Sequence, residues 1–223
     1  MSKLVWDADA QRLYETGTSK GVLYTRDDEG GYKTGVAWNG LTGVTESPSG
    51  AEPTDLWADN MKYLTMRSAE DLGATVTAYT YPVEFGECDG SATVTTGMKI
   101  GQQSRRSFGL CYQTVVGNDV AGNDYGYKIH ILYGCTASPS ERGYSTINDS
   151  PEAIEFSWEL TTTPVAVEGY KPTSIVTIDS TEFKTEEQKA KLKALEDKLY
   201  GTESDEPTLL LPDEIKALLT AEG

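Results

Sequence analysis

The chain has 223 residues, enough for one domain with an extension or for two small domains, and its composition is that of a globular protein. Its formal charge of −16 is spread along the chain, which disfavours binding to nucleic acid and to anionic membranes. A single histidine, His130, excludes multi-histidine metal sites. The three cysteines contain no CxxC pair, which argues against cysteine-bound zinc.

The residue types favour strands, because the threonines, valines and 13 tyrosines suit a pleated, half-buried surface. In the first third we expect short strands at Gly21–Tyr24 and Val36–Val44. A polar loop follows at Ser47–Pro53, and the chain returns as a strand at Asn60–Met66. These segments together predict a long hairpin or arm, with about residues 44–59 as its mobile part.

Ser68–Asp71 resembles the start of a helix, with Ser68 as its cap and acidic residues in the first turn. A two-sided strand is expected next at Ala74–Tyr81. Phe108–Val116 and Tyr127–Tyr133 read as two further strands. A Gly- and Asn-rich turn separates them, so we expect them to pair.

The cleanest strand pattern is Ala153–Thr162, in which apolar and polar side chains alternate. Ile154, Phe156, Trp158 and Leu160 define the buried face. Glu155 and Glu159 therefore belong to the opposite, solvated face.

The residue pattern changes from strand-like to mainly helix-like after Pro172. We expect one more strand at Ser174–Ile178, and then a helix at Thr185–Tyr200 that opens with the capping box Thr185–Gln188. A second short helix is predicted from Pro212 to Leu219. We therefore divide the chain into a β domain, residues 1–170, and a strand plus helical extension, residues 171–223.

Candidate chemistry is sparse. His130 lies in a predicted strand with no nucleophile or acid marked by the sequence beside it, so we interpret it as structural. Glu155 and Glu159 are about 13 Å apart along one strand, too far for a glycosidase acid pair. Asp119, Asn123 and Asp124 could coordinate calcium, but their turn lacks the spacing of a calcium loop. We expect no catalytic residues, no metal and no cofactor.

The N-terminal residues lack the apolar segment of a signal peptide, and no apolar run approaches the length of a membrane span. We therefore expect a cytosolic compartment in which Cys88, Cys111 and Cys135 stay reduced. An acidic β protein with a long arm and no marked chemistry indicates a structural or interaction role.

Many short strings, in order, resemble one family: the major tail proteins, or tail tube proteins, of bacteriophages with long non-contractile tails and Gram-positive hosts. The resemblance covers about residues 4–180. It is carried by Tyr14–Gly17, Lys20–Tyr24, Gly35–Thr42, Glu46–Pro53, Ala58–Tyr63, Ala78–Pro82, Glu87–Gly90, Ile100–Gln103, Phe108–Tyr112, Ile147–Glu152 and Phe156–Pro164.

The resemblance implies a β-sandwich or barrel with a flanking helix. With the long loop or arm and the C-terminal helical segment expected from the residue patterns, the fold class is mainly β. The resemblance also implies a structural virion protein without catalysis or cofactor. Its subunits would form hexameric rings that stack into a tube, the conduit for DNA. The implied partners are further copies of the chain, a tape measure protein inside the tube, and tail terminator and distal tail proteins at its ends. The implied locations are the virion tail and, during assembly, the host cytoplasm.

The family offers no residue motif to transfer, so the candidate sites are inferred from this sequence. Glu155 and Glu159 are candidates for the wall of the lumen, where carboxylates would repel DNA phosphates and let the DNA slide. The candidate assembly arm consists of Glu46, Ser47, Pro48, Ser49, Gly50, Ala51, Glu52 and Pro53.

Two alternatives stay open at this point. One is a different virion ring protein with a similar fold, from the neck or the distal tail, which would not need to polymerise. The other is a sugar-binding β domain that uses aromatic side chains, for which Trp38 and Trp57 are the candidates because they flank the predicted loop.

Overall fold

The computed structural model describes residues 3–147, 149–150 and 152–221. It confirms the mainly β class. Eight strands form one continuous antiparallel sheet in the order β2-β1-β9-β10-β11-β6-β3, with β12 also paired to β10. These strands are β1 (Leu13–Thr25), β2 (Val36–Trp38), β3 (Leu41–Gly50), β6 (Glu70–Ala78), β9 (Phe108–Asn118), β10 (Gly122–Ala137), β11 (Phe156–Thr161) and β12 (Ile175–Asp179).

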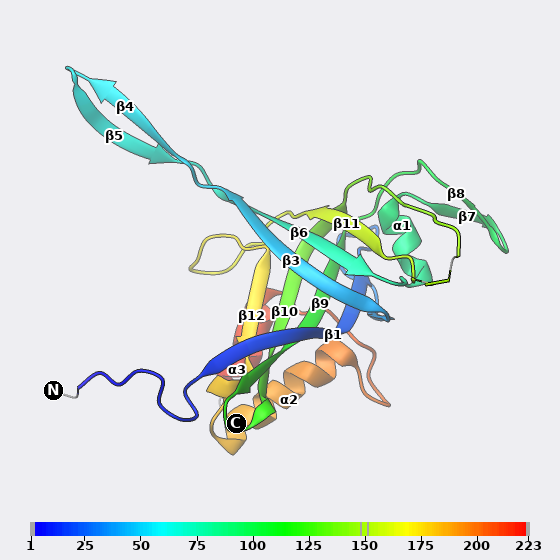
Figure 1. The fold of residues 1–223 in the computed structure, drawn as a ribbon. Coiled ribbons are helices and arrows are strands. Elements are labelled where there is room, and N and C mark those ends of the chain that lie inside the picture. Colours follow the sequence, from blue (N-terminus) through cyan, green and yellow to red (C-terminus); the bar gives the residue numbers. More distant parts are fainter. Residues whose placement is uncertain (1–2, 148, 151, 222–223) are drawn as a thin grey trace.

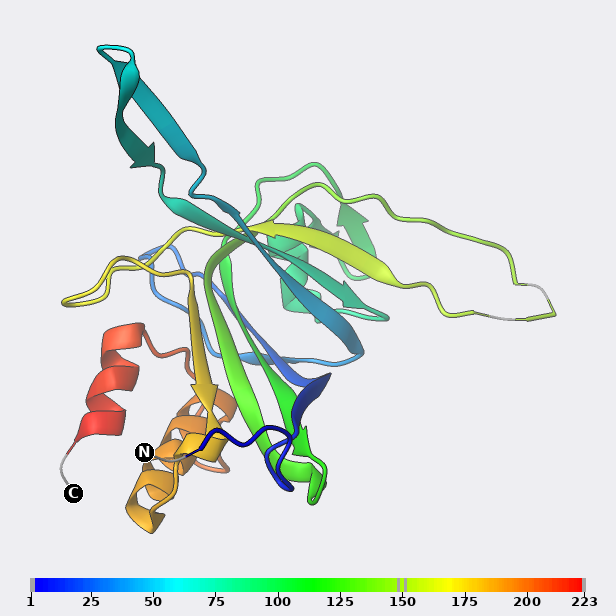
Figure 2. The same cartoon turned by 60° about the vertical axis from the view of Figure 1, so that its left-hand side comes forward.

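The sheet folds over on itself at the end of β10, so that β11, β6 and β3 cross over the main layer (Figure 2). Most of β10 pairs with β9 and β12, whereas Thr136 and Ala137 pair with β11. The register slips between Leu132 and Cys135, and Gly134 lies there with φ +57°. A Cβ on Gly134 would lie 2.4 Å from the Thr163 carbonyl oxygen, so this bend needs glycine.

The core between the two layers is aromatic. Trp158 of β11 packs edge-on against Phe85 and Trp38, with ring centroids 5.1 and 5.7 Å away. All three rings are buried, and edge-to-face contacts of this kind add to the stabilisation from burial. The alternation predicted for residues 153–162 is confirmed, since Trp158 and Leu160 are buried while Glu155 and Glu159 are exposed.

The other face of the main layer is covered by the C-terminal helices α2 (Glu186–Tyr200) and α3 (Pro212–Thr220) (Figure 1). Leu192, Leu195 and Leu199 of α2 pack with Ile129 and Ile131 of β10. Because the main layer is buried on both faces, β9 is an almost continuously buried strand. The predicted capping box is present, with Thr185 accepting from the Gln188 amide.

Smaller elements complete the fold. A 3-10 turn (Val83–Phe85) and the single-turn helix α1 (Gly86–Asp89) lead to the hairpin β7 (Ala92–Thr95) and β8 (Met98–Ile100). A second 3-10 turn (Ser180–Glu182) joins β12 to α2, and a separate hairpin is formed by β4 (Pro53–Ala58) and β5 (Met61–Arg67). No helix in the described part of the chain is long and apolar enough to cross a bilayer.

Three local predictions are wrong. The single strand expected at Val36–Val44 is two strands, because the chain turns at Gly40 (φ +75°); β2 pairs with β1, whereas β3 pairs with β6. The helix start at Ser68–Asp71 is absent, because Glu70 and Asp71 begin β6 and pair with Gly50 and Ser49 of β3. Long-range pairing thus overrides a local capping pattern. The prediction of a polar loop at Ser47–Pro53 is also wrong, because β3 extends to Gly50 and β4 starts at Pro53. Pro48 is compatible with β3 because this strand lies at the edge of the sheet.

Candidate assembly surfaces

The arm is a β-hairpin that projects beyond the body of the protein (Figures 1 and 2). It continues the β3–β6 pair outward through β4 and β5, which turn at Asp59 and Asn60. Every residue of β4 and β5 is exposed. The arm is therefore held at its root alone, and its side chains are free to contact another molecule.

Strand pairing sorts the arm's side chains into two faces, since directly opposed residues point to the same side. Leu56 pairs with Leu64, and Met66 and Met61 pair with Thr54 and Ala58. We call Leu56, Met61, Leu64 and Met66 the apolar face of the arm; their exposed fractions range from 39% to 64%. Solvent-exposed apolar groups collected on one side of a projecting hairpin are typical of a contact surface.

The opposite face of the arm is mostly polar. Lys62 lies 2.8 Å from the Asp55 carboxylate, and the Thr65 hydroxyl donates to the same carboxylate at 2.7 Å. Trp57 pairs with Lys62 and is 69% exposed. The sequence reading missed the apolar face, although the alternation of Leu56 and Ala58 and of Leu64 and Met66 could have revealed it.

The residues proposed from sequence as the assembly arm lie at its root. Ser47–Gly50 pair with Gly73–Glu70 of β6, and Ala51 donates its amide to the Ala69 carbonyl at 3.3 Å. Ser47 to Glu52 are intermediate or exposed, and Pro53 starts the projecting hairpin. Glu46 differs from the rest, because its carboxylate contacts Tyr112 and His130 of the main layer.

The outer face of the β3–β6–β11 layer is polar. On this face Thr75 of β6 pairs with Thr45 of β3 and with Glu159 of β11, and Thr77 of β6 pairs with Ser157 of β11. Glu159 is exposed, and Glu155 accepts a 2.6 Å hydrogen bond from the Thr42 hydroxyl just before β11. The structure therefore brings both proposed lumen residues to one side of one layer, as the alternation predicted.

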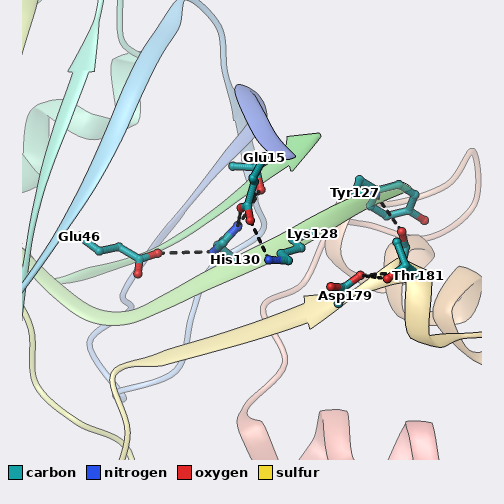
Figure 3. A network of polar contacts seen from close by, with 9 residues as sticks. Glu15, Glu46, Tyr127, Lys128, His130, Asp179 and Thr181 are labelled. Carbon is teal, nitrogen blue, oxygen red and sulfur yellow. Dashed lines mark hydrogen bonds and ion pairs between the residues drawn. The ribbon is translucent and has the colours of Figure 1, made fainter. Parts of the chain in front are cut away.

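His130 is enclosed between the two layers (Figure 3). Its ring stacks on Tyr112 with the centroids 4.8 Å apart, and its side chain is 11% exposed. Nδ1 lies 3.4 Å from a Glu46 oxygen, and Nε2 lies 3.5 Å from a Glu15 oxygen. The histidine thus joins β10 to β1 on one side and to β3, the root of the arm, on the other.

The surrounding contacts set the charge of this network. The Lys128 ammonium donates to Glu15 at 2.7 Å, which lowers the pKa of the Glu15 carboxyl and raises the pKa of Lys128. Burial lowers the pKa of His130 below its usual value, against the attraction of Glu46 and Glu15. The ring is therefore neutral at neutral pH.

The contact of Thr114 with His130 resembles part of a nucleophile–base–acid relay, at 3.0 Å between Oγ1 and Nε2. The hydroxyl of Thr114, however, donates to Glu15 at 2.6 Å, so its proton is not directed at the imidazole. The Glu46 carboxylate already accepts from the Tyr112 hydroxyl at 2.6 Å. The arrangement supports the structural interpretation of His130 made from sequence.

The remaining candidates have structural partners. Asp119 accepts from the Ala10 amide and from Arg12, and Asn123 accepts from the Tyr14 hydroxyl, so this turn ties down the start of β1. Within the described residues, no group of three or more His, Cys, Asp or Glu side chains is placed to hold a metal ion. All three cysteines are free and buried.

The pair of tryptophans expected for sugar binding is not formed. Trp38 is 3% exposed, and its ring packs against Phe85 in the core. Its Nε1 donates to the Thr80 carbonyl at 2.9 Å, so no face of this indole is open to a ligand. Trp57, on the arm, is the exposed member of the pair.

Comparisons with known proteins add little. No protein-family model matches the chain, and no curated protein matches its sequence. Among solved structures, the chain is similar to a chain in the "Cryo-EM Structure of an Extracellular Contractile Injection System, PVC sheath-tube complex in extended state". The identity is 10% and the TM-score 0.29, with 72% of this chain and 88% of that chain covered. A likeness of this degree carries no weight for function, so the function of this chain has to be inferred from its own residues.

Proposed function

We propose that this chain is the tail tube subunit of a bacteriophage with a long, non-contractile tail. In this role hexameric rings stack into the conduit through which DNA enters the host. The single observation that carries the proposal is the arm, whose apolar face has no partner among the described residues of its own chain. Apolar side chains that stay exposed to water raise the free energy of the isolated subunit. A neighbouring subunit that covers this face would remove that cost.

The polar layer supports the same role. A conduit for DNA needs a wall that does not bind phosphates, since each cationic contact adds salt-sensitive affinity. The outer face with Glu155, Glu159 and its threonine rows offers carboxylates and hydroxyls. We propose that this face is turned toward the lumen. The helices α2 and α3 would then lie on the outside of the tube, because they cover the side of the main layer that is turned away from the β3–β6–β11 layer.

The geometry of the arm supports polymerisation. An arm from one subunit that lies on a different surface of the next makes a head-to-tail contact, which closes into rings or continues as a tube. The net charge of −16 is compatible with stacking, because at physiological salt repulsion extends about 8 Å. In the virion the tube would enclose a tape measure protein and end on terminator and distal tail proteins.

The proposal is tested by removing the arm without disturbing its root. Replacing residues 52–68 by Asn-Gly joins Ala51 to Ala69, whose backbones are already hydrogen-bonded, through a two-residue hairpin turn. We expect the variant to melt like the parent, since the removed residues lie outside both cores, and to remain unassembled under conditions where the parent forms sedimentable tubes.

Three results would be informative. Tubes from the shortened variant at the parent's yield would contradict the role of the arm. Closed rings from the parent, without tubes at any concentration, would favour a neck or distal-tail ring protein. A parent that stays monomeric and binds glycans through Trp57 would favour the sugar-binding alternative.

A further inference from the structure

The N-terminal segment carries exposed apolar residues that the arm does not explain. Leu4, Val5 and Trp6 are 70% to 74% exposed and lie outside every strand and helix. Three successive large apolar side chains in water are unusual unless a partner covers them. In an extended segment Leu4 and Trp6 point to one side and Val5 to the other.

A candidate receptor for this segment lies at the edge of the main layer. The strand β2 is the last in its sheet and, among the described strands, pairs with β1 alone. The Gly35 amide just before it donates to the Pro207 carbonyl at 2.8 Å, so the part of the outer edge left for an added strand is that of β2 itself, around Ala37. Beside it is an open pocket of about 470 Å³. Its walls are mainly apolar and include Val22, Ala37, Tyr200 and Pro207. Lys20 also lines it, with its ammonium 5.5 Å from the centroid of the Tyr200 ring.

We propose that Leu4–Trp6 of one subunit adds as a short strand to β2 of a second copy of this chain and inserts Trp6 into this pocket. Trp6 placed opposite Ala37 would point to the pocket, because directly opposed residues of paired strands point to the same side. Ala37 and Val22 are cross-strand partners that both line the pocket, so an added strand would place alternate side chains beside them. Lys20 would meet Asp7 and Asp9, which follow Trp6 in the sequence, and this charge pairing favours the contact.

The segment cannot reach the pocket of its own chain while its base is held. Ala10 is fixed to the far end of β9 by hydrogen bonds with Asp119 and Asn118. From Ala10 to Trp6 the chain spans at most about 14 Å. The distance from Leu13, which pairs with Asn118, to Val22, which pairs with Cys111, is about 23 Å, because seven steps along β9 separate the two pairs. A second copy is therefore the occupant that the geometry selects.

This contact rests on the proposed function, in that it would join neighbouring subunits of the same tube, but it uses a surface separate from the arm. The test is a disulfide between exposed positions, Trp6→Cys with Ala37→Cys, on a chain whose own cysteines are buried. Trp6→Cys with Val94→Cys is the matched control, because Val94 is 57% exposed on the distant β7–β8 hairpin.

We expect oxidation of the assembled protein to give a ladder of covalent multimers for the first variant and none for the control. We also expect Trp6→Ala to raise the protein concentration needed for assembly about tenfold. Assembled tubes without a ladder, a ladder of equal strength in the control, or a crosslink confined to single chains would each overturn the inference. A ladder in a protein that forms no tubes would support the contact and contradict the proposed function.

Discussion

The apolar face of the arm makes a quantitative prediction. Leu56 and Leu64 form a cross-strand pair at its centre and are 42% and 39% exposed. Full burial of a leucine contributes about 1.5–3 kcal/mol, so covering the exposed fraction of each contributes about 1 kcal/mol, or about 2 kcal/mol per subunit for the pair. Leu56→Ser with Leu64→Ser should therefore raise the critical concentration for assembly about 30-fold, since 1.4 kcal/mol corresponds to a factor of ten.

The matched control is Asp55→Ser with Lys62→Ser, which makes the same number of serines on the opposite face. It removes an ion pair whose two side chains are both exposed, and such a pair contributes little to the free energy of unfolding. The assay is sedimentation of assembled protein over a dilution series, with the melting temperature of each variant measured first. Equal critical concentrations for the two double variants would refute the assignment of this face to assembly.

Three further predictions concern other parts of the molecule. Glu155→Lys with Glu159→Lys should leave folding nearly unchanged, since both side chains are exposed, while the tubes gain DNA retention at low salt that is lost at high salt; retention equal to that of parent tubes would place the two residues outside the lumen. Burial raises the pKa of the Cys88, Cys111 and Cys135 thiols to about 12, so a thiol reagent at pH 8 should label them only after unfolding, and tubes should persist in reducing agent; rapid labelling of the native protein would contradict this. Because the pKa of His130 is lowered in the folded state, the unfolded state takes up the proton first. The free energy of unfolding should therefore fall as pH drops below about 6.5, by at most about 1.4 kcal/mol per pH unit for this one proton. When urea titrations between pH 7.5 and 5.5 are used to plot this free energy against pH, His130→Gln should give a shallower slope than the parent, and identical slopes would remove His130 as the cause.

Much of the fold could be predicted from the sequence where local pattern and tertiary environment agree. The alternation around Trp158 and the capping box at Thr185 each follow from nearest neighbours along the chain, and both are confirmed. The pairing of β9 with β10 was predictable because a short turn joins them. Local rules failed at Ser47–Gly50 and at Ser68–Asp71, because Ser49 and Gly50 pair with Asp71 and Glu70 and so extend β3 and β6.

The polar network around His130 could not be predicted in the same way. Glu15, Glu46 and His130 come from three strands separated by long stretches of sequence, and no spacing marks them as neighbours. The register of β1 with β9 and the fold-over of the β3–β6–β11 layer bring them together. The two lumen candidates were found because they lie on one strand pattern, whereas the apolar face of the arm depends on pairing between β4 and β5.

Electron microscopy of the purified, unmodified protein over a range of concentrations tests the central claim most directly. The proposed function predicts long tubes of uniform diameter with six-fold symmetry in end view, formed above a critical concentration without any added partner. A protein that remains monomeric at every concentration, with its arm and N-terminal segment uncovered, would contradict the proposal that this chain builds a tail tube.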